Sequence, residues 1–225
     1  MLNVIYEDNH IIVVIKPQNV PSQEDSSKDV DMLTLVKEYI KEKYNKPGNV
    51  FVGLVHRLDR PTGGLMVFAK TSKAAARLSE AIKNNEVNKN YLACVEGKVK
   101  NTVGTLKDYL KKNEKTNTVS VVGAAESNAK YAELNYQVVA EQKNVTLVKV
   151  GLITGRSHQI RAQFKHMGNV LYNDFKYGSS TKGNLALWAY ELKFVHPTTK
   201  QKMTFKVVPN NSGVWKLFEK EISIL

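Results

Sequence analysis

The sequence is poor in cysteine and has no long apolar segment. Cys94 is the one cysteine among 225 residues, which excludes an intramolecular disulfide and a cysteine-built zinc site, and we expect it in the core. The longest apolar runs, such as residues 11–15, are far shorter than the roughly 20 residues that a membrane-spanning helix needs. Glu7 and Asp8 stand where a signal peptide would carry lysines and then a long apolar stretch. These features predict a cytoplasmic protein.

Several ligand-binding motifs are missing as well. The five histidines are not placed at the spacing of metal ligands, and the chain has neither an HExxH motif nor a Cys/His cluster. It also lacks a Walker A motif and a GxGxxG motif, and the Thr-Gly-Gly of residues 62–64 is too short for a nucleotide loop. We therefore expect neither a metal nor a cofactor.

Negative charge is scarce relative to positive charge. The chain has 33 Lys and Arg against 21 Asp and Glu, a formal net charge of +12. Such an excess suits a polyanionic partner, because each basic group set against a phosphate releases a counterion. Nucleic acid is the first candidate. An anionic membrane surface is the alternative, but residues 33–44 are short and contain two glutamates, unlike a basic amphipathic helix.

Hydrophobic patterning predicts short strands mixed with a few helices. Strands are expected at residues 11–15, 65–69, 91–95, 131–140 and 144–152, with a final hairpin at 185–195 and 201–208. Helices are expected at residues 33–44, 73–85 and 157–166. Residues 21–31 read as a surface loop, and residues 100–130 as a solvated loop or hairpin whose lysines (107, 111, 112 and 115) could form a peripheral RNA track. No repeat or linker divides the chain. We expect one α+β domain over residues 1–225, with a large mixed, mostly antiparallel sheet flanked by helices and loops.

The densest polar group lies in residues 54–70, LVHRLDRPTGGLMVFAK. Pro61 forces Arg60 into an extended conformation, the glycine pair after it permits a sharp turn, and an apolar strand follows. Asp59 is thus presented on a tight loop between two arginines, whose charges favour the ionised form of a carboxylate. Such a group can act as a nucleophile. The alternative is that Asp59 pairs with an arginine to hold the turn, and that His56 is a structural hydrogen-bonding residue.

A second polar group lies in residues 152–163, LITGRSHQIRAQ. Arg156, His158 and Arg161 fall in or beside the first turn of the predicted helix. Helix N-termini bind anions through free N–H groups, and arginines strengthen such a site. The pattern therefore predicts a phosphate or carboxylate site, with ordinary surface charge on an amphipathic helix as the alternative.

HRLDRPTGGLMVFAK resembles the signature HRLD-x-x-T-S/G-G-L-x-x-F-A-K of the RluA/RluD family of RNA pseudouridine synthases. TGRSHQIRAQ is similar to the G-R-S/T-H-Q-I-R motif of the same family. The resemblance extends over almost the whole chain, because further segments match in the same order: YEDNHIIVVIKP, KNY followed by YLACVEGKV, DFKYG, and ELKFVHPTTKQKMTFKVV.

This resemblance implies a pseudouridine synthase domain that isomerises specific uridines in structured rRNA or tRNA, without cofactor or metal. Asp59 would be the nucleophile, Tyr91 would lie against the target base, and Arg161 would hold Asp59 ionised through a salt bridge. Arg57 would help to displace the target nucleotide, which must be flipped out of its stack. His56, Arg60, Arg156 and His158 are also expected to contact RNA.

Three positions depart from the usual family pattern. Gly63 stands where serine is common, Asn173 where glycine usually precedes Asp174, and Trp188 where histidine is frequent. The chain starts at the catalytic part, so we expect no N-terminal S4 domain, and a monomer that grips RNA by itself. A non-catalytic RNA-binding protein on the same scaffold is the second hypothesis, although it would need none of the three proposed catalytic residues.

Overall fold

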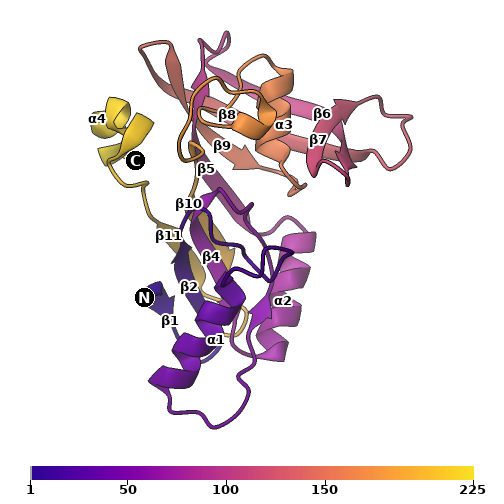
Figure 1. Ribbon diagram of the computed structural model, residues 1–225. Helices are drawn as coiled ribbons and strands as arrows, with labels where there is room; N and C mark the ends of the chain where they lie inside the picture. Colours follow the sequence, from indigo (N-terminus) through magenta and orange to yellow (C-terminus); the bar gives the residue numbers. More distant parts are fainter. Residues whose placement is uncertain (1) are drawn as a thin grey trace. The chain divides into compact units, whose positions relative to one another are not determined.

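The computed structural model describes residues 2–225, which divide into two compact units (Figure 1). The first unit comprises Met1–Val87 and Glu191–Val207, and the second comprises Asn88–Tyr190 and Val208–Leu225. Strand β10 (Leu187–Val195) passes from the second unit into the first. No helix within residues 2–225 is long and apolar enough to cross a membrane.

The first unit is a sheet with two helices. Its other elements are β1 (Asn3–Glu7), β2 (Ile11–Lys16), α1 (Met32–Lys43), β3 (Gly53–Leu54), β4 (Gly63–Ala69), α2 (Ser72–Lys83) and β11 (Lys202–Lys206). The strands follow the order β1-β2-β4-β10, and β3 pairs with β4 as β11 does with β10. The pairs β1–β2, β2–β4, β3–β4 and β10–β11 are antiparallel.

Strands β2 and β4 form the centre of this unit because both of their faces are apolar. On one face, Ile11, Leu65 and Val67 pack in a cluster with Ala74 and Leu78 of α2. The alternate residues of both strands, such as those at 12, 14, 66 and 68, are equally buried, and α1 buries an apolar stripe of its own. The predicted strands and helices of this region are confirmed, and the Oγ1 atom of Thr71 accepts a hydrogen bond from the Ala74 backbone N–H at 3.2 Å as the N-cap of α2.

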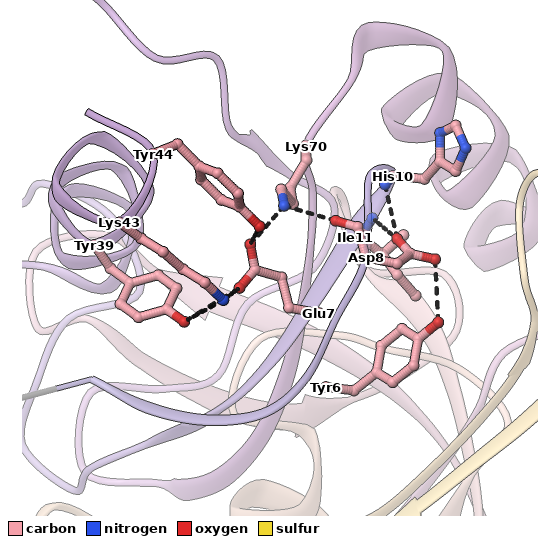
Figure 2. Close-up of polar contacts among 9 residues, drawn as sticks. All are labelled: Tyr6, Glu7, Asp8, His10, Ile11, Tyr39, Lys43, Tyr44 and Lys70. Carbon is pink, nitrogen blue, oxygen red and sulfur yellow. Dashed lines mark hydrogen bonds and ion pairs between the residues drawn. The ribbon is translucent and has the colours of Figure 1, made fainter. Parts of the chain in front are cut away.

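A buried carboxylate fastens the end of α1 to β1 (Figure 2). Glu7 accepts hydrogen bonds from Lys43 Nζ at 2.6 Å, from Lys70 Nζ at 2.5 Å and from the Tyr44 hydroxyl at 2.9 Å. The hydroxyl of Tyr39 lies 3.2 Å from the same carboxylate. Burial by itself would raise the pKa of Glu7, but the hydrogen bonds from the two lysines and Tyr44 outweigh it and lower the pKa to about 2.

The second unit is an antiparallel sheet with short helices. Its elements are β5 (Asn88–Glu96), β6 (Val103–Asn113), β7 (Thr118–Val122), β8 (Lys130–Gln142), β9 (Val145–Leu152), α3 (Gln159–His166), the 3-10 helices η1 (Phe175–Tyr177) and η2 (Gly213–Phe218), and α4 (Glu219–Ser223). The strand order is β5-β9-β8-β6-β7. Helix α3 packs on one face, where Ala162 joins Leu110, Val119, Ala132 and Tyr177 in a core cluster.

The predicted α+β class with mostly antiparallel strands is confirmed. Residues 100–130, for which a loop or a hairpin was expected, contain the β6–β7 hairpin. Strands β1 and β3, both 3-10 helices and α4 were not predicted. The structure divides into two compact units, and the expectation of one domain over residues 1–225 stays a prediction.

Candidate active site

Asp59 lies on the loop between β3 and β4, half-buried, as the sequence predicts. Its carbonyl oxygen accepts a hydrogen bond from the Thr62 N–H at 2.9 Å, which closes a tight turn around Pro61. Gly64 follows with φ of +118°, a conformation that other residues rarely adopt. The conformation of the loop before β4 is therefore determined by its own residues.

Lys16 at the end of β2 and the residues after it bind the backbone of both neighbours of Asp59. Lys16 is fully buried, and its Nζ donates hydrogen bonds to the carbonyls of Pro17 at 2.9 Å, Val20 at 2.7 Å and Arg60 at 2.9 Å. The hydroxyl of Ser22 donates to the Leu58 carbonyl at 2.8 Å and accepts from the Leu58 N–H at 3.1 Å. Gln18 Nε2 donates to the Pro61 carbonyl at 3.0 Å, and the Asn19 N–H donates to the Arg60 carbonyl at 2.8 Å. These bonds fix the backbone on each side of Asp59.

Lys16 and Asp59 also interact through their charges. Burial lowers the pKa of Lys16 to about 7, while the charge of Asp59 acts in the opposite direction and favours the ammonium form. The three carbonyl acceptors use all three protons of that ammonium group. The loop thus places a buried cation within electrostatic reach of the candidate nucleophile.

His56 and Arg57 differ in their surroundings. The Nε2 atom of His56 accepts a hydrogen bond from the Val67 N–H of β4 at 3.0 Å, which matches the structural interpretation of this histidine. Arg57 is exposed, and its side chain has no hydrogen bond or ion pair with any other residue in the range 2–225. Of the two, Arg57 has its donors available for a ligand.

Arg60 is engaged with the polar loop of residues 21–31. Its Nη1 donates to the Ser27 hydroxyl at 2.9 Å, and its Nη2 forms a short ion pair with Asp29. Its Nε donates to the Asn19 carbonyl at 3.1 Å. The expected RNA contact of Arg60 stays a prediction, but the side chain has a structural function that the sequence did not predict, because its partners lie more than 30 residues earlier in the chain.

Tyr91 lies on β5 and is 7 % exposed. It pairs directly with Val150 of β9, which pairs with Tyr136 of β8, and residues so paired share one face of the sheet. The ring of Tyr136 packs edge-on against Phe164 of α3, with ring centroids 5.7 Å apart. The side chain of Tyr91 is therefore on the face that α3 covers.

Arg161 of α3 is buried and bound to Asp174. Its Nε donates to Asp174 Oδ2 and its Nη2 to Asp174 Oδ1, both at 2.7 Å, in a bidentate contact. The guanidinium carbon lies 4.7 Å from the centre of the Tyr177 ring. The predicted salt bridge of Arg161 with Asp59 stays a prediction, and Asp174 is a partner that sequence reasoning did not assign.

The segment before α3 is tied to the same network. The Nδ1 atom of His158 lies 2.8 Å from the Tyr177 hydroxyl, which accepts a hydrogen bond from the Val119 N–H at 2.8 Å. Arg156 is exposed, and its Nε donates to the Tyr131 carbonyl at 2.9 Å. The predicted anion site at this helix end stays a prediction; His158 and Arg156 both have partners within the fold.

The lysines of the β6–β7 hairpin mostly face acidic partners. Lys107 lies 3.6 Å from Glu133, Lys111 lies 2.5 Å from Glu126, and Lys112 lies 2.6 Å from Glu114. This pairing weakens the expectation of an RNA track along these lysines, since a neutralised ammonium group releases fewer counterions from RNA.

Comparison with known proteins identifies the family. Residues 10–166, which include Asp59, Tyr91 and Arg161, match the family described as RNA pseudouridylate synthase. The chain belongs to this family. The chain is 30 % identical over 209 residues to an uncharacterized RNA pseudouridine synthase of Mycoplasma pneumoniae, and the match covers 91 % of this chain and 66 % of that protein. It is 30 % identical over 210 residues to the ribosomal large subunit pseudouridine synthase C of Haemophilus ducreyi, covering 89 % of this chain and 63 % of that protein.

The chain therefore spans slightly less than two thirds of the length of these relatives. An uncharacterized RNA pseudouridine synthase of Bacillus subtilis, YjbO, is 32 % identical over 210 residues, covering 91 % of this chain and 71 % of that protein. Among solved structures, human RNA pseudouridylate synthase domain containing 4 superposes with a TM-score of 0.77 at 19 % identity, covering 92 % of this chain and 89 % of that one. These comparisons confirm the family expected from the sequence and the predicted fold.

Proposed function

We propose that the protein isomerises uridine to pseudouridine in RNA, with Asp59 as nucleophile, Tyr91 against the target base and Arg161 paired with Asp59. The observation that carries this proposal is the family match over residues 10–166, which contains all three side chains. The rigid mounting of Asp59 supports it further, because a catalytic group must be held close to its productive geometry.

The reaction conserves every atom of the nucleotide. The bond from the ribose C1′ to N1 of uracil breaks, the base rotates, and a bond from C1′ to C5 forms while C5 loses a proton and N1 gains one. The base must first leave its stack, and an aromatic face such as Tyr91 stabilises a flipped base by roughly 1–3 kcal/mol. The carboxylate of Asp59 attacks the base, attacks the sugar or promotes loss of a ribose proton; all three routes require an ionised and accessible Asp59.

For the substrate we favour large-subunit rRNA in the cytoplasm, bound by a monomer. The support is the name of relatives such as the ribosomal large subunit pseudouridine synthase C of Haemophilus ducreyi. The net charge of +12 suits RNA, and exposed Arg57 is the residue near Asp59 best placed to contact the displaced strand. We expect His56, Arg60, Arg156 and His158 to contribute to RNA binding more through the segments that they hold in place than through direct contacts.

The test is to map pseudouridine by carbodiimide-stop sequencing in total RNA from cells with the protein, without it, and with Asp59→Asn. We expect at least one uridine whose modification requires the protein and disappears with Asp59→Asn, while RNA binding stays within a few-fold. Glu38→Gln, which changes an exposed carboxylate on α1 of the same unit, is the matched control and should keep the modification. Full modification by Asp59→Asn would refute the assignment of Asp59 as the nucleophile. A pseudouridine map that is the same with and without the protein would favour the hypothesis of a non-catalytic RNA-binding protein.

A further inference from the structure

The ring of Phe175, on η1, is 77 % exposed. Within residues 2–225, only Ile224 next to the chain end is a more exposed large apolar residue. The flanking residues Asp174 and Tyr177 are both 2 % exposed. The segment therefore turns two side chains into the fold and presents Phe175 to solvent, where the ring buries little apolar surface and adds little to stability.

The mounting of Phe175 is rigid. Asp174 is fixed by its bidentate contact with Arg161, and Tyr177 is fixed in the core cluster and by the Val119 N–H. The backbone closes on itself as well, since the Tyr177 N–H donates to the Asp174 carbonyl at 3.0 Å and the Gly178 N–H donates to the Phe175 carbonyl at 3.2 Å. A ring held in this way loses little conformational entropy when it contacts a ligand.

The surroundings of Phe175 favour a nucleic acid over a protein or a membrane as its partner. Lys176 beside it is exposed, with its Nζ 3.3 Å from the Asn117 carbonyl in the β6–β7 turn. Lys165 Nζ lies 5.8 Å from the centre of the Tyr177 ring, and the adjacent carboxylate of Asp174 is neutralised by Arg161. A protein-docking patch or a membrane anchor needs several adjoining apolar side chains. A lone aromatic ring among cations instead suits an unpaired base with its phosphates.

We propose that Phe175 stacks on an unpaired base adjoining the target uridine, with Lys176 beside the neighbouring phosphate. This inference rests on the proposed function, because Asp174 next to Phe175 holds the candidate catalytic Arg161. It implies that the preferred substrate is a loop or bulge, in which a base flanking the uridine is free to stack, and not an uninterrupted duplex.

The test uses the full chain and a transcript that carries the mapped uridine. Phe175→Ala should raise KM about tenfold and change kcat little, since one base–aromatic stack is lost. Phe175→Trp should restore KM and Phe175→Leu should not, which separates stacking from apolar contact. Phe51→Ala is the matched control, because Phe51 is also a phenylalanine with 51 % exposure, and it should leave KM unchanged. Circular dichroism should show all variants folded, because the ring is outside the core.

A second measurement removes the base instead of the ring. Transcripts with one abasic nucleotide on either side of the target uridine should weaken binding of the wild-type protein about tenfold at one of the two positions, and should weaken Phe175→Ala no further. An active wild-type protein with an unchanged KM for Phe175→Ala, or full rescue by Phe175→Leu, would refute the stacking role and leave the proposed function intact. A wild-type protein that forms no pseudouridine would refute both.

Discussion

Replacement of Asp174 by asparagine probes the pair that holds Arg161. The side chains of Arg161 and Asp174 are 5 % and 1 % exposed, and the two hydrogen bonds between them are 2.7 Å long. An amide of the same shape keeps one acceptor oxygen but turns an NH2 group toward the guanidinium, so at least one bond is lost. The arginine then stays buried without its counter-ion, a change that costs about 3–5 kcal/mol in other proteins. We expect a value near the lower end, since the Tyr177 ring still contacts the guanidinium.

Urea unfolding followed by circular dichroism measures this loss. With an m-value of about 2 kcal/mol per molar urea, the midpoint should fall by about 1.5 M. Asp108→Asn is the matched control: Asp108 accepts one hydrogen bond at 2.7 Å from the neutral amide of Gln163, also on α3, so the same change should cost only about 1 kcal/mol. An Asp174→Asn variant no less stable than the Asp108→Asn control would refute the reasoning from charge burial.

Activity separates positioning from stability. Well below the unfolding midpoint, Asp174→Asn should lower kcat by about 100-fold, since a displacement of about 1 Å in a catalytic group costs that much. The double variant Arg161→Met with Asp174→Leu replaces the pair by apolar side chains and should recover most of the lost stability. It should stay inactive, because Arg161 itself is gone. Recovery of activity together with stability would show that the pair serves only the fold.

Two further predictions concern ionisation in the first unit. Glu7 has a pKa of about 2 in the fold against 4.5 without partners, so its contribution of about 3 kcal/mol is present above pH 4.5 and is lost as the pH falls through 2. The difference in unfolding free energy between the wild-type protein and Glu7→Gln, measured by urea titration, should shrink over that pH window. Lys16 has a pKa of about 7 against 10.5, so the unfolded chain holds more protons between these values and stability should rise with pH by up to ~1.4 kcal/mol per unit. Lys16→Met should remove that rise between pH 7 and 9, and an unchanged slope would contradict the assignment.

Local sequence patterns predicted the structure correctly where a residue's neighbours in sequence decide its conformation. The apolar run of β2 and the cap of α2 could be predicted, because burial on both faces and a threonine hydroxyl leave direct signals in the sequence. The Asp59 turn could be predicted for the same reason, since Pro61 and the glycines fix its backbone. The sequence could not decide between a loop and a hairpin for β6–β7, because Leu110 is the one buried residue of β6 and the lysines of this strand mask the alternation.

Long-range partners could not be predicted in this way. Lys16 binds the Arg60 carbonyl 44 residues away, and Asp174 binds Arg161 13 residues away, so neither contact leaves a local pattern. The family resemblance named Arg161 and the DFKYG segment separately, without a reason to join them. Arg60 was expected to contact RNA because it is basic and lies beside Asp59, whereas its carboxylate partner Asp29 lies in a loop that composition alone describes as solvated.

Each of the two candidate catalytic groups, Asp59 and Arg161, is positioned by a buried side chain of opposite charge. Asp59 is half-buried, and the fully buried Lys16 binds the carbonyl of the next residue, Arg60. Arg161 is buried, and so is Asp174, the carboxylate that binds it. Both partners carry a desolvation cost that an apolar side chain of similar size would avoid, so neither is an efficient means of stabilising the fold. Buried charge that is costly for stability yet fully hydrogen-bonded is expected where a functional group has to be oriented. Apolar replacement of both members of the Asp174–Arg161 pair should therefore recover stability relative to Asp174→Asn without recovering activity, whereas substitutions in the cores of β2 and β4 should lower stability and activity together.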